Sequence, residues 1–280
     1  MARIVVYTNP LDRIYVPRVG WPPVIGTYLL CLGLRDLVLR GHRFRIVKEP
    51  KPVGADLAIL HTDCTIADDE YVGLSSHFEH AVNFIKDISK RKVSKSLLAR
   101  TDAWSGRVIV KSDLNYGGAV EVRRNEEAQK RGLPIPYPGA EVKPSYDIYD
   151  SIDAAPDAVW EDRGLVVEKF LPELDPEGYA TRTWVFMGDK WSCMRHVSTE
   201  PIVKARGIVK SERIEPSPEI FEERKRLGMD FGKFDYVEHE GRTVLLDANR
   251  TPGIPNVPRR IRRIEGRNIA DGLLGILKGR

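Results

Sequence analysis

The stretch FDYVEHEGRTVLLDANRTPG, residues 234–253, carries the most information about the fold. Its two β-rich segments flank Gly241, which is typical of a hairpin whose three-residue loop holds the glycine in the left-handed conformation. Because strand side chains alternate between two faces, Asp247 and Asn249 share one face. An odd-numbered loop places Asp235 on that face as well. We therefore expect these three oxygen-bearing side chains to lie together on a rigid hairpin.

Two carboxylates and a carboxamide, with no Cys or His among them, form a set of hard oxygen ligands. Such a set suits Mg²⁺, whose coordination is usually completed by water and nucleotide phosphates. The alternative is a surface hairpin with scattered polar residues. Val237, Val244 and Leu245-Leu246 supply enough apolar area to bury the hairpin, and acids beside buried positions need a partner. We favour the metal site.

Composition limits the class of protein. The chain has 280 residues, of which 42% are hydrophobic and 30% charged, so it can form one large or two smaller globular domains. Its three cysteines are widely separated, which predicts neither a disulfide framework nor a zinc site and fits a reducing compartment. The apolar stretch before Asn9-Pro10 is too short for a signal-peptide core, and no later stretch approaches the length of a membrane span. We expect a cytoplasmic protein without a membrane partner.

The net charge of +4 is concentrated near the C-terminus, where residues 255–280 hold seven basic residues against two acids. The basic residues are Arg259, Arg260, Arg262, Arg263, Arg267, Lys278 and Arg280. Such a cluster attracts phosphates, nucleic acid or acidic substrates, but it lacks interleaved aromatic residues for stacking on bases. A solvated basic face beside an anion site is therefore favoured over a nucleic-acid partner.

The first 80 residues predict a βαβ-like layer. Strands are expected at residues 2–7, 44–47 and 56–61, and a helix at residues 23–39. His61, Asp63 and Asp68-Asp69-Glu70 follow the third strand, where an open α/β sheet presents its ligand-binding loops. We favour helix capping and loop solvation for them over substrate contact. The lysines of residues 82–98 are interpreted as the solvated face of a helix.

A predicted strand at residues 107–111 ends in Lys111, and a turn with Gly117 and Gly118 follows. An ammonium next to free backbone N–H groups is a phosphate-binding arrangement. Residues 118–164 are predicted to be a long, proline-rich connection with one short helix at residues 126–130, which is typical of a lid or binding loop.

A strand at residues 165–173 can offer backbone groups to an adenine edge at its end, while Asp175 or Glu177 accepts hydrogen bonds from ribose hydroxyls. A hairpin is expected next, with strands at residues 181–187 and 191–197 around Gly188-Asp189. Arg195 on this hairpin suits either a phosphate clamp or a structural ion bridge, and the sequence leaves both open.

In chain order, the lysine-bearing strand, the glycine turn, the E-K-F-L strand end, the arginine hairpin and the D-A-N-R-T-P-G motif resemble the ATP-grasp superfamily, in particular the ligases of the glutathione synthetase and D-Ala-D-Ala ligase type. The resemblance covers about residues 82–253. The family pattern has an acid in the first strand and Glu-x-Asn in the second. This chain has Asp235 and then Asp247-Ala248-Asn249, so that Asp247 is one methylene shorter than the usual Glu.

The resemblance implies a mixed α/β and α+β fold. An N-terminal open α/β domain at residues 1–80 would precede a two-lobed ATP-grasp domain at residues 81–280. The lobes implied are a central lobe at about residues 100–172 and a C-terminal, metal-binding lobe at about residues 173–280. The central lobe is expected to be abbreviated, because the chain between Lys95 and Lys111 is short.

The resemblance also implies ATP as cosubstrate and Mg²⁺ as cofactor, with Mn²⁺ as a substitute. Its metal ligands would be Asp235, Asp247 and Asn249. Its nucleotide-binding residues would be Lys95 (or Lys90), Lys111, Gly117, Gly118, Glu168, Lys169, Phe170, Leu171, Asp175 and Glu177. Lys233 and Arg195 would be the catalytic residues that stabilise the transferring phosphoryl group.

The chemistry implied is ligation: a carboxylate attacks the γ-phosphoryl group of ATP, and an amine or similar nucleophile then displaces phosphate from the acylphosphate. Small-molecule or peptide carboxylates and amines are the expected substrates, and the run of residues 259–267 could face an acidic substrate or an acidic carrier. The alternatives are an ATP-grasp kinase acting on a hydroxyl and a non-catalytic nucleotide- or RNA-binding protein. The sequence leaves the oligomeric state open, a homodimer included.

Overall fold

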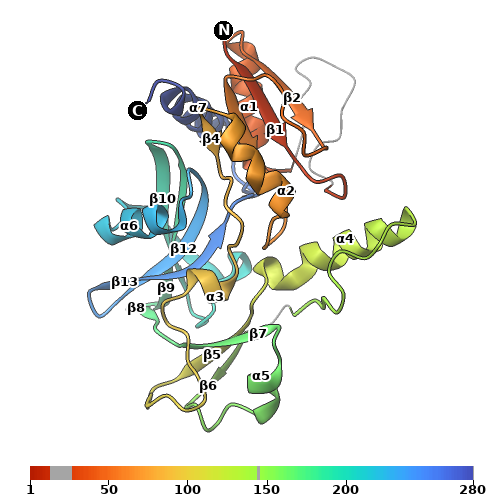
Figure 1. Ribbon diagram of the computed structural model, residues 1–280. Helices are drawn as coiled ribbons and strands as arrows, with labels where there is room; N and C mark the ends of the chain where they lie inside the picture. The colour runs from red at the N-terminus through yellow and green to blue at the C-terminus, as the bar shows by residue number, and fades with distance from the viewer. Residues whose placement is uncertain (13–26, 144–145, 280) are drawn as a thin grey trace.

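The computed structural model describes residues 1–12, 27–143 and 146–279, which form three sheets with helices between and around them (Figure 1). The N-terminal sheet is parallel, in the order β2-β1-β3-β4. Its strands are β1 (Arg3–Tyr7), β2 (Arg43–Val47), β3 (Leu57–Leu60) and β4 (Ala81–Val82). The three predicted strands of this region are thus present: the apolar runs of β1 and β3 are buried, and β2 is the partly exposed edge strand.

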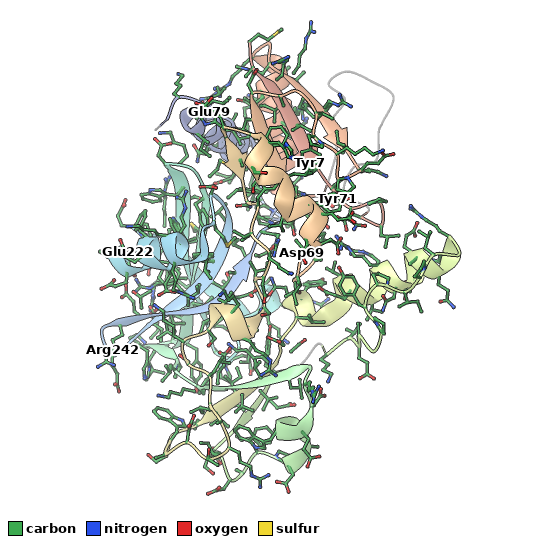
Figure 2. The ribbon with its side chains drawn as sticks, viewed as in Figure 1. Tyr7, Asp69, Tyr71, Glu79, Glu222 and Arg242 are labelled. Atoms are coloured by element: carbon green, nitrogen blue, oxygen red, sulfur yellow. The ribbon has the colours of Figure 1, made fainter. Side chains whose placement is uncertain are left out.

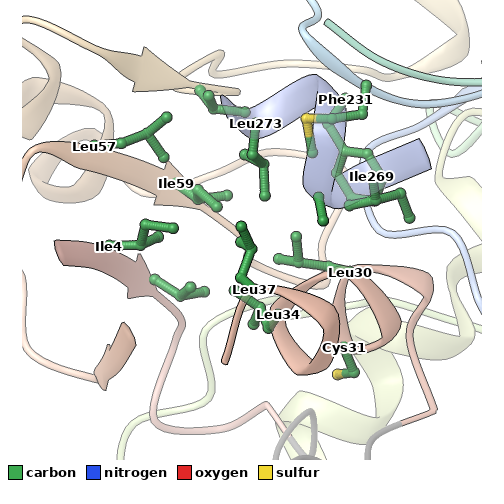
Figure 3. Packing of buried hydrophobic residues seen from close by; sticks show 14 of the residues in the cluster. Ile4, Leu30, Cys31, Leu34, Leu37, Leu57, Ile59, Phe231, Ile269 and Leu273 are labelled. Atoms are coloured by element: carbon green, nitrogen blue, oxygen red, sulfur yellow. The ribbon is translucent and has the colours of Figure 1, made fainter. Parts of the chain in front are cut away.

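Helix α1 (Leu29–Leu39) covers one face of this sheet together with α7 (Arg259–Ile276), so the two ends of the chain share one core (Figure 3). Leu30 and Leu34 of α1 pack in the same cluster as Ile269 and Leu273 of α7. The helix predicted at residues 23–39 begins at Leu29, and residues 23–26 lie outside the described part. The other face of the sheet packs around Tyr7 and Tyr71 (Figure 2).

The prediction of a helix at residues 82–98 is wrong. Asn83 has a positive φ of 60°, and its carboxamide bonds the backbone at Asp230 and Phe231. Only the four residues of α3 (Lys90–Val93) are helical, and Lys90 is 3% exposed rather than solvated. Backbone bonds to distant segments, such as that from the Lys90 N–H to the Asp113 carbonyl, replace the helical bonds here.

The central sheet is small and antiparallel, in the order β6-β5-β7. Its elements are β5 (Val108–Ser112), β6 (Asp147–Tyr149), β7 (Leu165–Lys169) and the covering helix α5 (Asp157–Glu161). The helix predicted at residues 126–130 is longer than expected: α4 (Ala119–Lys130) begins directly after the glycine turn and extends away from this sheet (Figure 1). A buried ion pair between Arg124 and Asp12 attaches α4 to the N-terminal domain instead.

The third sheet is antiparallel, in the order β11-β10-β9-β12-β13, with β8 paired to β9. Its strands are β8 (Glu173–Asp175), β9 (Gly178–Met187), β10 (Lys190–Ser198), β11 (Ile208–Arg213), β12 (Phe231–His239) and β13 (Arg242–Asn249). Helix α6 (Pro218–Leu227) covers it, and the short helices α2 (Asp69–Val72), η1 (Gly73–His77), η2 (Asn115–Gly118) and η3 (Ala205–Gly207) lie in connections. The predicted β9-β10 hairpin is present. Within the described part of the chain, no helix has the length and apolar character of a membrane span.

The β12-β13 hairpin differs from the prediction in its loop. His239 pairs with Arg242 at the tip (Figure 2), so the loop has two residues, Glu240 and Gly241, both with positive φ. An even loop alone would turn Asp247 to the opposite face from Asp235. A β-bulge between Asp235 and Tyr236 corrects the register, so that Asp235 lies directly opposite Asp247. The shared face was predicted correctly, but the bulge produces it.

Substituting Gly272 in α7 tests the packing of this helix on the β9-β10 turn. A Cβ at Gly272 would lie 2.1 Å from the Met187 carbonyl oxygen, so we expect Gly272→Ala to lower the free energy of unfolding by at least about 2 kcal/mol in urea titrations. Gly275→Ala is the matched control, because its Cβ meets only the flexible Asp189 side chain and alanine favours the helix. Equal stability of the two variants would contradict this packing.

Candidate functional site

Three lysines and three carboxylates gather where the central sheet, the third sheet and α3 meet; we call them the charge cluster. Its members are Lys90 from α3, Lys111 from β5, Glu168 from β7, Lys233 and Asp235 from β12, and Asp247 from β13. Lys111 pairs with Glu168 at 2.7 Å, and Lys233 pairs with Asp235 at 2.7 Å. Lys90 bonds both the Asp247 carboxylate and the Asn115 side chain. Each ammonium therefore has a carboxylate partner.

The surroundings of Asp247, Lys90 and Lys233 favour the charged forms of these three side chains. Burial alone would raise the pKa of the Asp247 carboxyl, but the Lys90 ammonium outweighs burial and keeps that pKa below its usual range. The pKa of Lys90 is raised correspondingly, because Asp247 outweighs the opposing effect of burial. For Lys233, the nearby Asp235 charge raises the pKa. At neutral pH the cluster is a set of balanced ion pairs.

The hairpin offers an oxygen donor set that fits Mg²⁺ or Mn²⁺. Asp235 and Asp247 lie opposite each other, and Asn249 is held in place because its Oδ1 accepts the N–H of Thr251 at 2.8 Å. In residues 1–12, 27–143 and 146–279, no three His, Cys, Asp or Glu side chains form a metal cage. Two carboxylates and one carboxamide are oxygen donors that suit an ion which keeps water and phosphate ligands. In the structure, lysines pair with both carboxylates. A metal ion therefore fits these donors only when phosphates compete for those lysines.

Of the two upstream lysines, the structure brings Lys90 to the charge cluster. Lys95 instead lies at the surface, 64% exposed, in an ion pair with Glu223 of α6. Gly117 and Gly118 adopt positive φ values of 63° and 81° in the turn between β5 and α4. Glycine takes up this left-handed conformation at no steric cost, which favours glycine at both positions of the turn that follows the Lys111 strand.

The predicted adenine-binding segment is Glu168, Lys169, Phe170 and Leu171, at the end of β7. The backbone N–H of Lys169 bonds the Ser96 carbonyl, and that of Phe170 bonds the Arg107 carbonyl. The Lys169 ammonium also lies over the Trp104 ring, and the Arg107 guanidinium over the Phe170 ring. Two N–H groups of this segment are thus already used within the protein.

Arg195 occupies an ion-pair network, which is the second of the two alternatives that the sequence leaves open. Its guanidinium bonds Glu173 at 2.7 Å and Asp175 at 2.8 Å, and Glu212 lies at 3.3 Å. Asp175, a predicted ribose contact, is therefore engaged by Arg195. Glu177 is exposed, and its backbone N–H bonds Asp175. The structure does not place Arg195 among the partners of the charge cluster.

A cavity of about 160 Å³ adjoins the charge cluster. Lys233, Asp247 and Asn249 line it from the hairpin, and Asp63 and Glu121 line it from the N-terminal side. The cavity therefore joins the predicted metal ligands to two acids that the sequence did not single out as site residues.

The favoured interpretation of Asp63 as a solvated or capping residue is wrong. Asp63 is only 8% exposed, because it accepts hydrogen bonds from Arg123 at 2.6 Å and from the Thr251 hydroxyl at 2.9 Å. Tyr28 donates a further bond to it. Its position at the carboxyl end of a buried parallel strand was the available signal. Glu121 gave no such signal, because the start of α4 was not predicted.

No protein-family model matches the chain, and no curated protein matches it in sequence. Among solved structures, the ATP-grasp ligase PsnB in complex with the precursor peptide PsnA2 and AMPPNP is similar, with a TM-score of 0.53, 13% identity, and 98% of each chain covered. PsnB was also solved with a minimal precursor, Mg and ADP, with a TM-score of 0.52 to this chain.

Two further structures match at lower similarity. The D-alanine–D-alanine ligase of Bacillus anthracis has a TM-score of 0.47 and 12% identity, and covers 100% of this chain and 98% of its own. The macrocyclase MdnC of Microcystis aeruginosa, bound with precursor peptide MdnA, has a TM-score of 0.47 and 9% identity, with 95% and 99% covered. The likeness to PsnB shows that the chain has the ATP-grasp fold. The resemblance inferred from sequence is confirmed at the level of fold.

His61, at the end of β3, makes stability depend on pH. Burial lowers its pKa from 6.5 to about 4. Between these two pH values, the unfolded chain therefore binds a proton at His61 that the folded protein does not bind. Stability should therefore fall by about 3 kcal/mol from this group as pH drops from 6.5 to 4. Urea unfolding at a series of pH values measures this, and His61→Phe should flatten the slope. His77→Gln, at an exposed histidine, controls for the loss of an imidazole.

Proposed function

We propose that the chain is an ATP- and Mg²⁺-dependent ligase, which activates a substrate carboxylate as an acylphosphate and joins it to an amine or similar nucleophile. One observation carries the proposal: the charge cluster brings three ammonium groups next to the oxygens of the hairpin, within an ATP-grasp fold. Phosphoryl transfer needs little covalent chemistry from a protein, and positioned positive charge supplies most of its catalysis.

In this proposal, Lys111 and Lys90 hold the phosphates of ATP, with the N–H groups of the turn at Gly117 and Gly118 beside them. Positive φ values at both glycines support this role, because consecutive N–H groups in such turns form anion-binding concavities. Glu168 and the segment Lys169, Phe170 and Leu171 form the adenine side, and Asp175 or Glu177 the ribose side. Lys90 takes the place first given to Lys95, since Lys95 lies at the surface.

Asp235, Asp247 and Asn249 would hold Mg²⁺ or Mn²⁺, which when bound supplies positive charge next to the phosphates. Lys233 lies on the same face of the hairpin and lines the cavity, which supports its role in stabilising the transferring phosphoryl group. A substrate carboxylate oxygen forms a bond to the γ-phosphorus, and the bond from that phosphorus to the ADP oxygen breaks. An amine then attacks the acyl carbon, phosphate leaves with the acyl–oxygen electron pair, and the proton lost by the amine nitrogen passes to phosphate or to water.

Arg195 is better assigned a structural role in this proposal. Its described contacts include ion pairs with Glu173 and Asp175, and none of them is with a member of the charge cluster. Its network joins β8 to β10 and stiffens the sheet that carries the hairpin. A role at the phosphoryl group would require these ion pairs to break first.

Peptides are among the substrates that this proposal admits. PsnB was solved with a precursor peptide, and the arginine-rich start of α7 offers a surface for an acidic peptide or carrier. Arg259, Arg260 and Arg263 on that helix are exposed, which supports such a contact.

ATP binding and ADP release test the proposal as a whole. We expect calorimetry to detect ATP binding with Mg²⁺ present, and coupled assays to detect ADP release with a carboxylate from a panel of amino acids, peptides and small acids. Hydroxylamine in place of the amine should yield a hydroxamate. A stable phosphate ester would identify a kinase instead, and steeply salt-dependent RNA binding without ADP release would indicate the binding protein. Absence of ATP binding would exclude every one of these functions that depends on a nucleotide.

Neutralising the hairpin carboxylates should strongly reduce turnover in protein that still folds. We expect Asp235→Asn and Asp247→Asn each to reduce the rate of ADP release at least about 100-fold, because both groups would hold the metal at the transferring phosphate. Thermal melts check that the fold persists. Asp189→Asn, at an exposed turn, is the control and should retain the rate. Wild-type rates in both hairpin variants would contradict the metal assignment.

Lys111 and Lys95 should differ in their effect on nucleotide affinity. Lys111→Met removes a buried ammonium from the proposed phosphate site and should weaken ATP binding by roughly 10- to 100-fold in calorimetry. Lys95→Met removes a surface ion pair and should change affinity less than about threefold. If the Lys95 variant lost more affinity than the Lys111 variant, the nucleotide would have to lie nearer α6.

A further inference from the structure

The segment that follows Asn249 leaves the hairpin and docks on the N-terminal domain. The backbone N–H of Leu29, at the start of α1, bonds the Pro252 carbonyl at 2.8 Å. Thr251, one residue earlier, is only 6% exposed. The predicted metal ligand Asn249 is therefore separated by two residues from a contact between two parts of the fold.

The Thr251 hydroxyl lies between two oxygen acceptors. Its Oγ1 is 2.9 Å from Asp63 Oδ1 and 3.4 Å from Asn249 Oδ1. A hydroxyl carries a single proton, so at any moment it donates to one of these two oxygens. The shorter distance and the negative charge of the carboxylate favour Asp63 as the acceptor.

The direction of this proton matters for Asn249. Its Oδ1 has two lone pairs, and one of them accepts the backbone N–H of Thr251 at 2.8 Å. The second lone pair stays free only while the Thr251 hydroxyl points to Asp63. A hydroxyl proton on that lone pair would compete with a metal ion, because both need the same electron pair.

Asp63 is held so that its Oδ1 serves Thr251. Its Oδ2 accepts hydrogen bonds from Arg123 at 2.6 Å and from the Tyr28 hydroxyl. Arg123 belongs to α4 and Tyr28 directly precedes α1, so two separate elements fix the carboxylate. Asp63 is only 8% exposed, which leaves water little access to the Thr251 hydroxyl from this side.

We propose that Asp63 is a positioning residue for the predicted metal site: by accepting the Thr251 hydroxyl, it keeps a lone pair of Asn249 Oδ1 free for Mg²⁺ or Mn²⁺. The inference rests on the proposed function and adds a residue of the N-terminal domain to its metal site. Groups that orient a metal ligand usually change metal affinity by roughly 10- to 100-fold when they are replaced.

Asp63→Asn should reverse the direction of the Thr251 hydroxyl. Two donors, Arg123 and Tyr28, face the Oδ2 position, so the new carboxamide turns its oxygen toward them and its NH₂ toward Thr251. The Thr251 proton then points to Asn249. We expect the affinity for Mn²⁺, measured by calorimetry on the full-length protein with AMPPNP present, to fall about 10-fold.

Asp69→Asn is the matched control. Asp69 follows the same strand, β3, but its side chain is 78% exposed and pairs with Lys86 at the surface. This variant should retain the wild-type affinity for Mn²⁺. Unchanged affinity in Asp63→Asn would overturn the inference.

Thr251→Val distinguishes positioning from a merely structural role of Asp63. It removes the hydroxyl but keeps the backbone N–H that holds Asn249, so alone it should change Mn²⁺ affinity less than about threefold. Combined with Asp63→Asn, it removes the misdirected proton and should restore affinity to within about threefold of wild type. A structural role predicts no such recovery, and its absence in a folded double variant would overturn the inference.

Three further outcomes separate this inference from the proposed function. Neutron diffraction of wild-type protein without metal should place the Thr251 hydroxyl deuteron toward Asp63; a deuteron toward Asn249 would overturn the inference even if Asp63→Asn does not fold. The expected pattern of Mn²⁺ affinities without ADP release from any acid would retain the positioning role and reject the ligase. ADP release whose dependence on Mg²⁺ is the same in wild type and Asp63→Asn would retain the ligase and reject the positioning role.

Discussion

The structure depends on charge balance inside the charge cluster. Three ammonium groups and three carboxylates are brought together from the central sheet, from the third sheet and from the segment that follows the N-terminal sheet. Each ion is matched by one of opposite sign. Unmatched charges in such a setting would cost several kcal/mol each, so the segments can approach only together. Mg²⁺ added alone would disturb this balance, as would ATP alone. In the proposed function, Mg²⁺ and ATP would arrive together, so that the metal would pair with the carboxylates and the phosphates with the lysines.

Geometry at the hairpin makes this exchange feasible. The bulge at Asp235 brings Lys233, Asp235, Asp247 and Asn249 to one face, so cationic and anionic groups stand side by side on two bonded strands. Neither strand has to move for the carboxylates to change partners; only the flexible lysine side chains do. The shorter Asp247 takes part in the same arrangement, because Lys90 donates a bond to its carboxylate.

The sequence was sufficient for features that depend on local pattern. Continuous apolar runs predicted β1 and β3, and the alternation along the hairpin predicted its shared polar face. It was insufficient where distant groups decide the local structure. Asn83 leaves the helical conformation because its side chain bonds the start of β12, and Lys90 is buried because Asp247 lies beside it. Glu121 and Asp63 acquire their setting only when α4 docks on the N-terminal domain, which no short-range pattern in the sequence encodes.

The shared core of α1 and α7 has a consequence for synthesis of the chain. The parallel sheet and α1 are synthesised before α7, but Leu30 and Leu34 of α1 pack in one cluster with Ile269 and Leu273 of α7. Domains usually fold as units while translation continues. Here the core beside the parallel sheet cannot close until α7 has emerged, and until then an apolar face of α1 stays exposed to chaperones and proteases. This sheet is thus made before the other two sheets, but its core is completed only after they have been synthesised.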